Sequence, residues 1–123
     1  MTKRILVIDD DLAIRKAFVL ALDDMPYQVD TAESGEKGIE MAEKDKYDLV
    51  FLDLKMPGIN GVETLREIRK TEKNVPVYIV TAFHKEFFDK LKDAAEDGID
   101  FELLSKPIGI EQIVLVTRSV LEG

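Results

Sequence analysis

The sequence predicts an α/β fold in which a five-stranded parallel sheet is doubly wound, with five helices distributed over both of its faces. Short apolar runs typical of buried strands alternate five times with longer stretches in which apolar residues recur every three or four positions. This alternation is typical of parallel strands joined by right-handed crossover helices. The chain has 123 residues, a length that suits one domain, so we expect residues 1–123 to form a single unit.

The composition narrows the possible functions. Apolar residues make up 46% of the chain and charged residues 34%, which is typical of a soluble globular domain. Cysteine is absent, so disulfides and thiolate metal sites are excluded. The formal net charge of −8 at pH 7 argues against direct binding of nucleic acid by this domain. No apolar run is long enough for a membrane span and no signal-peptide pattern is present, so we expect a cytoplasmic protein.

The first strand and the first helix meet at an acidic cluster. Residues 4–8 are a short β-branched apolar run, which predicts a buried strand that stops at Asp9 and Asp10. The apolar residues that follow recur at helical spacing. We therefore expect a helix there, with Asp11 as its N-cap and Pro26 as the residue that ends it.

The second strand is predicted over residues 28–32, and Ser34 is placed to cap the helix that follows it. That helix is expected to end at the charged turn 44–46. After the central strand, the same reasoning predicts elements in the order helix 62–72, strand 75–80, helix 86–96, strand 101–105 and helix 110–121.

The third, central strand ends on the residue around which the candidate site is organised. Residues 49–52 are four consecutive apolar residues, which predict a strand buried on both faces. Asp53 follows, and Pro57, Gly58 and Gly61 then break the regular structure. Ligand sites in open parallel sheets lie off the carboxyl ends of the strands, where Asp53 is expected. An Asp that merely ends a strand and begins a turn fits this stretch equally well.

Polar side chains follow four of the five predicted strands, namely Asp9 and Asp10, then Asp53, Thr81 and Lys106. In a doubly wound sheet the carboxyl ends of these strands converge on one crevice. Three carboxylates placed so closely repel one another, and a divalent cation relieves that repulsion. Oxygen ligands without His or Cys suit Mg²⁺, so the sequence predicts a magnesium site.

Such a site could carry phosphoryl transfer. With Mg²⁺ bound, a carboxylate can attack phosphorus and form an acyl phosphate. The Lys106 ammonium and the Thr81 hydroxyl are placed to neutralise oxygens of the transferred group. Ala82 is small and leaves the approach to Asp53 open.

Each of these residues also has an ordinary structural interpretation. The cluster 9–11 could be a solvated helix start favoured by the helix dipole. Thr81 could bond its own backbone, and Lys106 could be a surface cation. Their joint placement at successive strand ends favours a site. The single histidine, His84, follows a strand end with no acid nearby in sequence, and we interpret it as a loop residue and not as a phosphate carrier or metal ligand.

The chain carries, in order, the acidic cluster Asp9-Asp10-Asp11, Asp53-x-x-Met56-Pro57-Gly58-x-x-Gly61, Thr81-Ala82 and Lys106-Pro107. This set of motifs covers nearly the whole chain and resembles the receiver domain of two-component response regulators, of the kind found in chemotaxis regulators. The resemblance implies a flavodoxin-like fold with strand order 2-1-3-4-5. It also implies a phosphorelay signalling module that catalyses its own phosphorylation and dephosphorylation, and not an enzyme acting on other substrates.

The resemblance implies a role for each residue of the acidic site. Asp53 would be the phosphoacceptor and would also face the metal. Asp10 would bind Mg²⁺ directly, Asp9 mostly through water, and the backbone carbonyl of Lys55 would supply a further ligand.

The remaining implied roles concern the phosphoryl group and the partners. Thr81, Ala82 and Lys106 would contact the phosphoryl group or switch with it, and the peptide bond before Pro107 would be cis, which an X-Pro bond permits at low cost. The donor would be a phosphohistidine on a sensor histidine kinase or a phosphotransfer protein. Such a kinase would dock on the first helix, with Ile14 and Ala17 as candidate contacts.

The sequence departs from the family pattern near the fifth strand. Many receivers carry an aromatic residue three positions before the Lys, where this chain has Leu103, and the nearest aromatic is Phe101. These two residues are candidates for the switch core. No output domain fits within 123 residues, so the signal is expected to pass to a downstream protein or to an output domain outside this sequence.

Two other functions remain open from the residues alone. Asp9-x-Asp11 could mimic the paired aspartates of haloacid dehalogenase-type phosphohydrolases, although Ala13 stands where that family has Thr. A flavodoxin-like cofactor binder would need a phosphate-cradling loop after the first strand, and none is evident. Multiple turnover of p-nitrophenyl phosphate would indicate a hydrolase, and stoichiometric labelling a receiver.

Overall fold

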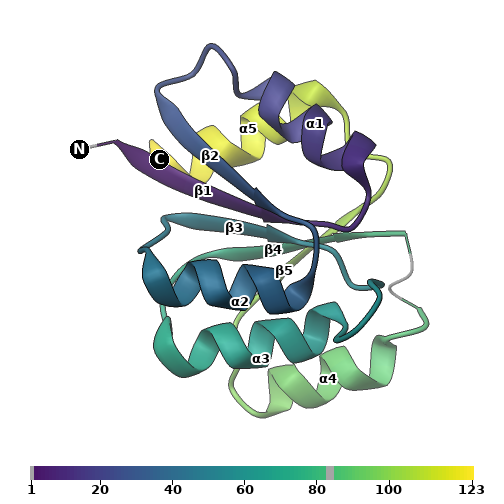
Figure 1. Ribbon diagram of the computed structural model, residues 1–123. Helices are drawn as coiled ribbons and strands as arrows, with labels where there is room; N and C mark the ends of the chain where they lie inside the picture. The colour runs from purple at the N-terminus through teal and green to yellow at the C-terminus, as the bar shows by residue number, and fades with distance from the viewer. Residues whose placement is uncertain (1, 83–84) are drawn as a thin grey trace.

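A computed structural model describes residues 2–82 and 85–123 as a twisted central sheet between two layers of helices (Figure 1). The strands are β1 (Lys3–Ile8), β2 (Tyr27–Ala32), β3 (Leu49–Leu52), β4 (Val77–Thr81) and β5 (Glu102–Ser105). The helices are α1 (Leu12–Ala21), α2 (Gly35–Lys44), α3 (Gly61–Thr71), α4 (Phe88–Glu96) and α5 (Ile110–Leu121). No helix among the described residues combines the length and the apolar character that a bilayer span needs.

All four strand pairings are parallel and the strand order is β2-β1-β3-β4-β5, which confirms the predicted fold class and topology. Figure 1 shows α1 and α5 on one face of the sheet and α2, α3 and α4 on the other. The order reverses at β1 and β3, so the carboxyl ends of these central strands open onto a crevice between outgoing loops.

The core lies in two layers because alternate strand residues point to opposite faces. Leu6, Ile8, Val50 and Leu52 belong to the cluster that includes residues of α2, α3 and α4. Ile5, Val7, Leu49 and Phe51 belong to the cluster shared with α1 and α5. All four residues of β3 are at most 1% exposed, which confirms a strand buried on both faces.

Side-chain caps fix where three helices begin, close to the carboxyl edge of the sheet. Asp11 Oδ1 accepts a hydrogen bond from the Ala13 N–H (2.9 Å), and Ser34 Oγ accepts one from the Lys37 N–H (3.1 Å). Both caps were predicted. Asn60 forms a capping box with Glu63 at the start of α3.

Several predicted boundaries were wrong by more than one residue. α1 ends at Ala21 and not near Pro26, because the chain turns at Leu22 and the next two residues are acidic, a charge that a helix C-terminus disfavours. β4 begins at Val77, two residues later than predicted, because Pro76 has no N–H to donate. α4 begins at Phe88 and not at residue 86, and its N-cap Phe87 makes no side-chain hydrogen bond.

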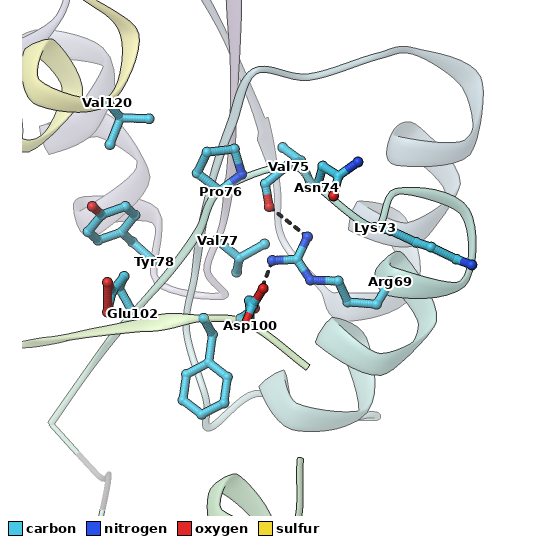
Figure 2. Close-up of a pocket in the computed structure, with 11 residues that line it drawn as sticks. Arg69, Lys73, Asn74, Val75, Pro76, Val77, Tyr78, Asp100, Glu102 and Val120 are labelled. Carbon is cyan, nitrogen blue, oxygen red and sulfur yellow. Dashed lines mark hydrogen bonds between the residues drawn. The ribbon is translucent and has the colours of Figure 1, made fainter. Parts of the chain in front are cut away.

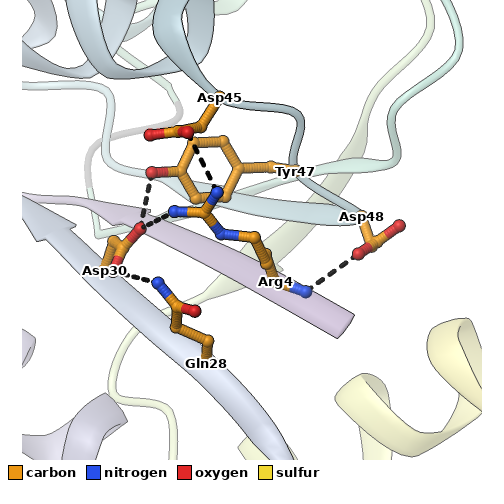
Figure 3. A network of polar contacts seen from close by, with 6 residues as sticks. All are labelled: Arg4, Gln28, Asp30, Asp45, Tyr47 and Asp48. Atoms are coloured by element: carbon orange, nitrogen blue, oxygen red, sulfur yellow. Dashed lines mark hydrogen bonds and ion pairs between the residues drawn. The ribbon is translucent and has the colours of Figure 1, made fainter. Parts of the chain in front are cut away.

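A polar network closes the amino edge of β1 and β2 (Figure 3). The Arg4 guanidinium pairs with Asp30 (2.9 Å) and Asp45 (3.0 Å) and lies 5.1 Å from the centre of the Tyr47 ring. The Tyr47 hydroxyl donates to Asp30 (2.7 Å), and the Arg4 N–H donates to the Asp48 carboxylate (2.8 Å). These bonds tie β1 to β2, to the end of α2 and to the start of β3.

A second, partly buried arginine lies beside a cavity of about 400 Å³ at the amino ends of β4 and β5 (Figure 2). Arg69, near the end of α3, donates hydrogen bonds to the carbonyls of Val75 (2.6 Å) and Asp100 (2.7 Å). These carbonyls belong to the segments that lead into β4 and β5. Arg69 therefore joins the two segments before strand pairing starts at Tyr78 and Glu102.

Candidate functional site

Asp53 follows β3 directly and is held at the carboxyl edge of the sheet. Its N–H donates to the Ile8 carbonyl of β1 (2.9 Å), and its side chain is buried. Burial raises the pKa of Asp53 to about 6; the charge of Asp9 adds to the rise, and Lys106 opposes it. A buried carboxyl with a raised pKa at a strand end is typical of a functional site.

Two more carboxylates come from the end of β1. Asp9 is buried and Asp10 is exposed, yet one oxygen from each lies within 4.8 Å of the other and of an oxygen of Asp53. The Asp9 N–H donates to the Ala32 carbonyl (3.1 Å), and its carboxylate accepts from the Asp11 N–H (2.9 Å). The predicted convergence of these three acids is therefore what the structure shows.

Lys106 supplies the cation of the site from the end of β5. Its Nζ lies 2.9 Å from Asp9 Oδ2 and 3.4 Å from Asp53 Oδ1. Burial lowers the pKa of Lys106, but the hydrogen bond to Asp9 and the charges of both carboxylates outweigh burial and leave the pKa raised. The peptide bond between Lys106 and Pro107 is cis.

Asp53 also carries a buried oxygen that lacks a donor. Within the described part of the chain Oδ1 receives no hydrogen bond, and its 3.4 Å contact with Lys106 is an ion pair that lacks hydrogen-bond geometry. Buried polar atoms are nearly always paired, so this oxygen points to a binding site. The cavity beside it has a volume of about 550 Å³ and is lined by Asp9, Asp10, Asp11, Asp53, Lys55, Met56, Pro57 and Lys106.

The donor set of this cavity fits Mg²⁺. Three carboxylates offer oxygens within reach of one another, and Lys55, whose backbone carbonyl was proposed as a ligand, lines the same cavity. Hard oxygen donors, with space left for water, are what Mg²⁺ prefers. A cation here would also satisfy the unpaired oxygen of Asp53 and offset the repulsion between the acids.

Thr81 and Ala82 lie at the end of the neighbouring strand β4, outside that cavity. Thr81 is buried and Ala82 is exposed. Thr81 lines a separate hollow of about 150 Å³ together with Leu103, Leu104 and Ser105. The structure therefore gathers the acids and Lys106 in one cavity and holds Thr81 beside it.

The two candidates for the switch core differ in burial. Leu103 is 48% exposed, and its role in the switch stays a prediction. It is exposed because β5 is an edge strand, and α4 lies beside α3 and away from β5 (Figure 1). Phe101 is partly buried and packs against the core cluster on the α2–α4 side of the sheet.

The candidate docking residues on α1 are half-buried. Ile14 packs against the core cluster between the sheet, α1 and α5, and Ala17 is of similar exposure. The exposed large apolar residues of this helix are Leu12, Val19 and Leu20. His84, interpreted above as a loop residue, lies outside the described residues.

One contact at the site was missed by the sequence reasoning. Arg15, on α1, donates a hydrogen bond from its guanidinium to the backbone carbonyl of Asp9 (2.7 Å). Arg15 lies four residues after the cap Asp11, so it is on the side of the helix that faces the start of the helix and the acidic loop. This spacing was the signal in the sequence that could have predicted the contact.

Comparison with known proteins gives a consistent result. The family described as response regulator receiver domain matches residues 5–118. The response regulator MprA of Mycolicibacterium vanbaalenii is 31% identical over 121 residues, which cover 98% of this chain and 51% of that protein. The response regulator ArlR of Staphylococcus saprophyticus is 35% identical over 124 residues, covering 98% and 53%. The chain thus spans about half the length of these curated relatives.

Solved structures agree with this. The CheY-like receiver domain protein of Methanospirillum hungatei superposes with a TM-score of 0.88 at 24% identity, covering 99% of this chain and 95% of that one, and shows the fold alone. The response regulator protein TrrA of Thermotoga maritima, solved in complex with Mg²⁺ and BeF, has a TM-score of 0.80 at 33% identity, covering 98% of this chain and all of that one.

Proposed function

The chain belongs to the response regulator receiver domain family of two-component systems, and we propose that residues 1–123 form one receiver domain in which Asp53 accepts the phosphoryl group. The observation that carries the proposal is the convergence of Asp53 with Asp9, Asp10 and Lys106 in one cavity at the carboxyl edge of the sheet. The alternative of a strand-ending Asp does not account for this convergence.

The proposed step is a transfer from phosphohistidine. An oxygen of Asp53 attacks phosphorus, a P–O bond forms, and the P–N bond breaks with its electron pair returning to the imidazole nitrogen. Asp53 must be ionised to attack, so its raised pKa matters for the rate. Lys106 would neutralise one oxygen of the transferred group, and the Thr81 hydroxyl and the Ala82 backbone would contact the others.

Mg²⁺ is the proposed cofactor, held by Asp9, Asp10, Asp53 and the Lys55 carbonyl. When bound, it would neutralise charge on the phosphoryl oxygens and on the clustered acids. The Asp9 carboxylate already receives the Asp11 N–H and Lys106 Nζ, which supports a water-mediated role for Asp9 and a direct one for Asp10. The complex of TrrA with Mg²⁺ and BeF, a phosphoryl mimic, supports a site of this kind.

The proposed partners follow from the family. The donor would be a sensor histidine kinase or a phosphotransfer protein in the cytoplasm, docking on α1 near Ile14 and Ala17. The domain would catalyse its own phosphorylation and dephosphorylation. The signal would pass to a downstream protein or to an output domain, because the curated relatives are about twice as long as this chain.

Labelling by a small phosphodonor tests the proposal. Acetyl phosphate with Mg²⁺ should add one phosphoryl group to the wild-type protein by mass spectrometry, and none to Asp53→Asn. The mark should be lost in alkali, as expected for an acyl phosphate. Labelling of Asp53→Asn, or many turnovers of p-nitrophenyl phosphate by the wild-type protein, would refute the proposal and favour a phosphohydrolase.

A further inference from the structure

Arg15 bonds the backbone of the acidic loop, residues 9–11, that joins β1 to α1. The residue lies half-buried on α1, and its guanidinium NH1 donates to the carbonyl oxygen of Asp9 at 2.7 Å. That carbonyl belongs to the peptide unit that joins Asp9 to Asp10. Because a peptide unit is planar, fixing its oxygen fixes the orientation of the whole plane, and with it the direction in which Asp10 leaves the loop.

The two acids differ in how they are held. Asp9 is fixed through all its polar groups, since its N–H bonds Ala32 and its carboxylate receives the Asp11 N–H and Lys106 Nζ. The Asp10 carboxylate is exposed and, within residues 2–82 and 85–123, no hydrogen bond or ion pair holds it. The orientation of the Asp10 side chain toward the cavity therefore depends on the conformation of its backbone.

We propose that Arg15 is a positioning residue for the cation site: by holding the Asp9–Asp10 peptide unit, it directs the Asp10 carboxylate toward the carboxylates of Asp9 and Asp53. This inference rests on the proposed function, because the cation it concerns is the proposed Mg²⁺. Arg15 acts through the backbone, and its contact with the loop is to the carbonyl of Asp9. Groups that orient metal ligands in this way commonly change metal affinity about 10- to 100-fold when removed.

The positive charge of Arg15 could also change Mg²⁺ affinity without any hydrogen bond to the loop. The neighbouring residue Lys16 provides the control for this effect. Lys16 is exposed on the same helix, and within residues 2–82 and 85–123 no hydrogen bond or ion pair joins it to the loop. Arg15→Met and Lys16→Met remove the same charge from adjacent positions, but only the first removes the hydrogen bond to Asp9. Arg15→Lys keeps the charge and a shorter donor.

The experiment measures Mg²⁺ affinity by titration calorimetry in these four proteins, after EDTA treatment and dialysis. We expect Arg15→Met to bind Mg²⁺ about tenfold more weakly than the wild-type protein. Lys16→Met should change the affinity by less than about twofold, because interactions of exposed charges are weak. Arg15→Lys should have an intermediate affinity. A second measurement needs no metal: in EDTA, exchange of the Asp11 amide, which bonds the Asp9 carboxylate, should be faster in Arg15→Met, while the amides of β3 stay as protected as in the wild-type protein.

Equal affinities in Arg15→Met and the wild-type protein would overturn the inference, and so would equal weakening in Arg15→Met and Lys16→Met. A lower melting temperature with unchanged Mg²⁺ affinity would show a structural role only. If the wild-type protein neither bound Mg²⁺ nor was labelled by acetyl phosphate, the proposed function would fail. Unchanged Asp11 exchange in Arg15→Met would separately show that Arg15 does not hold the loop.

Discussion

At the residue scale, the buried acids at the carboxyl edge of the sheet lower the stability of the fold, and the same acids are the candidate functional residues. Asp53 and Asp9 are buried acids, and the Lys106 ammonium contacts both of them. Burial, and after it the charge of Asp9, raises the Asp53 pKa to about 6 from its usual value near 4. The acidic cavity is therefore under electrostatic strain, which a bound cation would relieve.

This strain predicts a pH-dependent effect of Asp53→Asn on stability. Because the folded-state pKa of Asp53 is above the unfolded one, folding favours the protonated form; that contribution is complete below pH 4 and is lost as pH rises through about 6. In EDTA at pH 8, Asp53→Asn should therefore be more stable than the wild-type protein by roughly 1–3 kcal/mol, from about 1.4 kcal/mol per pKa unit.

Urea unfolding at pH 8 and at pH 4.5 checks this prediction. The stability gain of Asp53→Asn should shrink strongly at the lower pH, where the wild-type carboxyl is mostly protonated in the folded state. Asp97→Asn, at an exposed surface acid, is the control and should show little change at either pH. A gain for Asp53→Asn that is equal at both pH values would contradict the assigned cause.

At the scale of secondary-structure elements, one arginine joins the two segments that lead into β4 and β5. The segments before these strands are not paired with each other, since pairing starts at Tyr78 and Glu102. Arg69 bridges them through the carbonyls of Val75 and Asp100 beside the cavity of Figure 2. The guanidinium thus takes the place of backbone pairing at this end of the sheet.

Removing that bridge should lower stability. Arg69→Met keeps most of the apolar stem but removes the donor to the carbonyls of Glu72, Val75 and Asp100. We therefore expect a loss of about 1–3 kcal/mol in the free energy of unfolding. Lys73→Met is the matched control, because Lys73 lines the same cavity and is exposed. Chemical denaturation of both variants tests this, and equal stability in the two would show that the bridge contributes nothing.

At the scale of the whole molecule, the signal must leave the acidic cavity through neighbouring elements. Thr81 lies beside that cavity, in a separate hollow lined also by Leu103. Leu103 sits on an edge strand and is about half exposed, so its repacking affects few neighbours. The α4 helix, which follows β4 in the chain, offers another route.

We therefore expect a bound phosphoryl mimic to change the segment 81–91 more than β5. The added charge and acceptor oxygens should draw the Thr81 hydroxyl toward the site and move the loop with it. Beryllofluoride with Mg²⁺ and backbone NMR give the measurement: the largest shifts outside the cavity should lie in 81–91 and be nearly lost in Thr81→Ala. Thr71→Ala, at an exposed position on α3, should respond like the wild-type protein.

Two results would contradict this route. Undiminished shifts in Thr81→Ala would remove the hydroxyl from the mechanism. Larger shifts in Glu102–Ser105 than in 81–91 would show that β5 carries the change despite the exposure of Leu103.

The amino-acid sequence alone determined the order and type of all ten elements, the parallel sheet and the placement of the acids and Lys106 at the carboxyl ends of strands. These features are local or follow from connectivity. The period of apolar residues sets each element's type, a polar residue after an apolar run marks the strand end, and crossover rules bring the ends of parallel strands to one edge.

Only the tertiary structure decided how those residues meet. The Arg15 contact with the Asp9 carbonyl, the bridge made by Arg69 and the exposure of Leu103 depend on how helices pack against strands that are distant in sequence. The same holds for the hollow that Thr81 lines, which is separate from the acidic cavity. Hydrogen bonds to particular carbonyls and the burial of edge positions are set by packing between elements, which the periodicity of any one element does not encode.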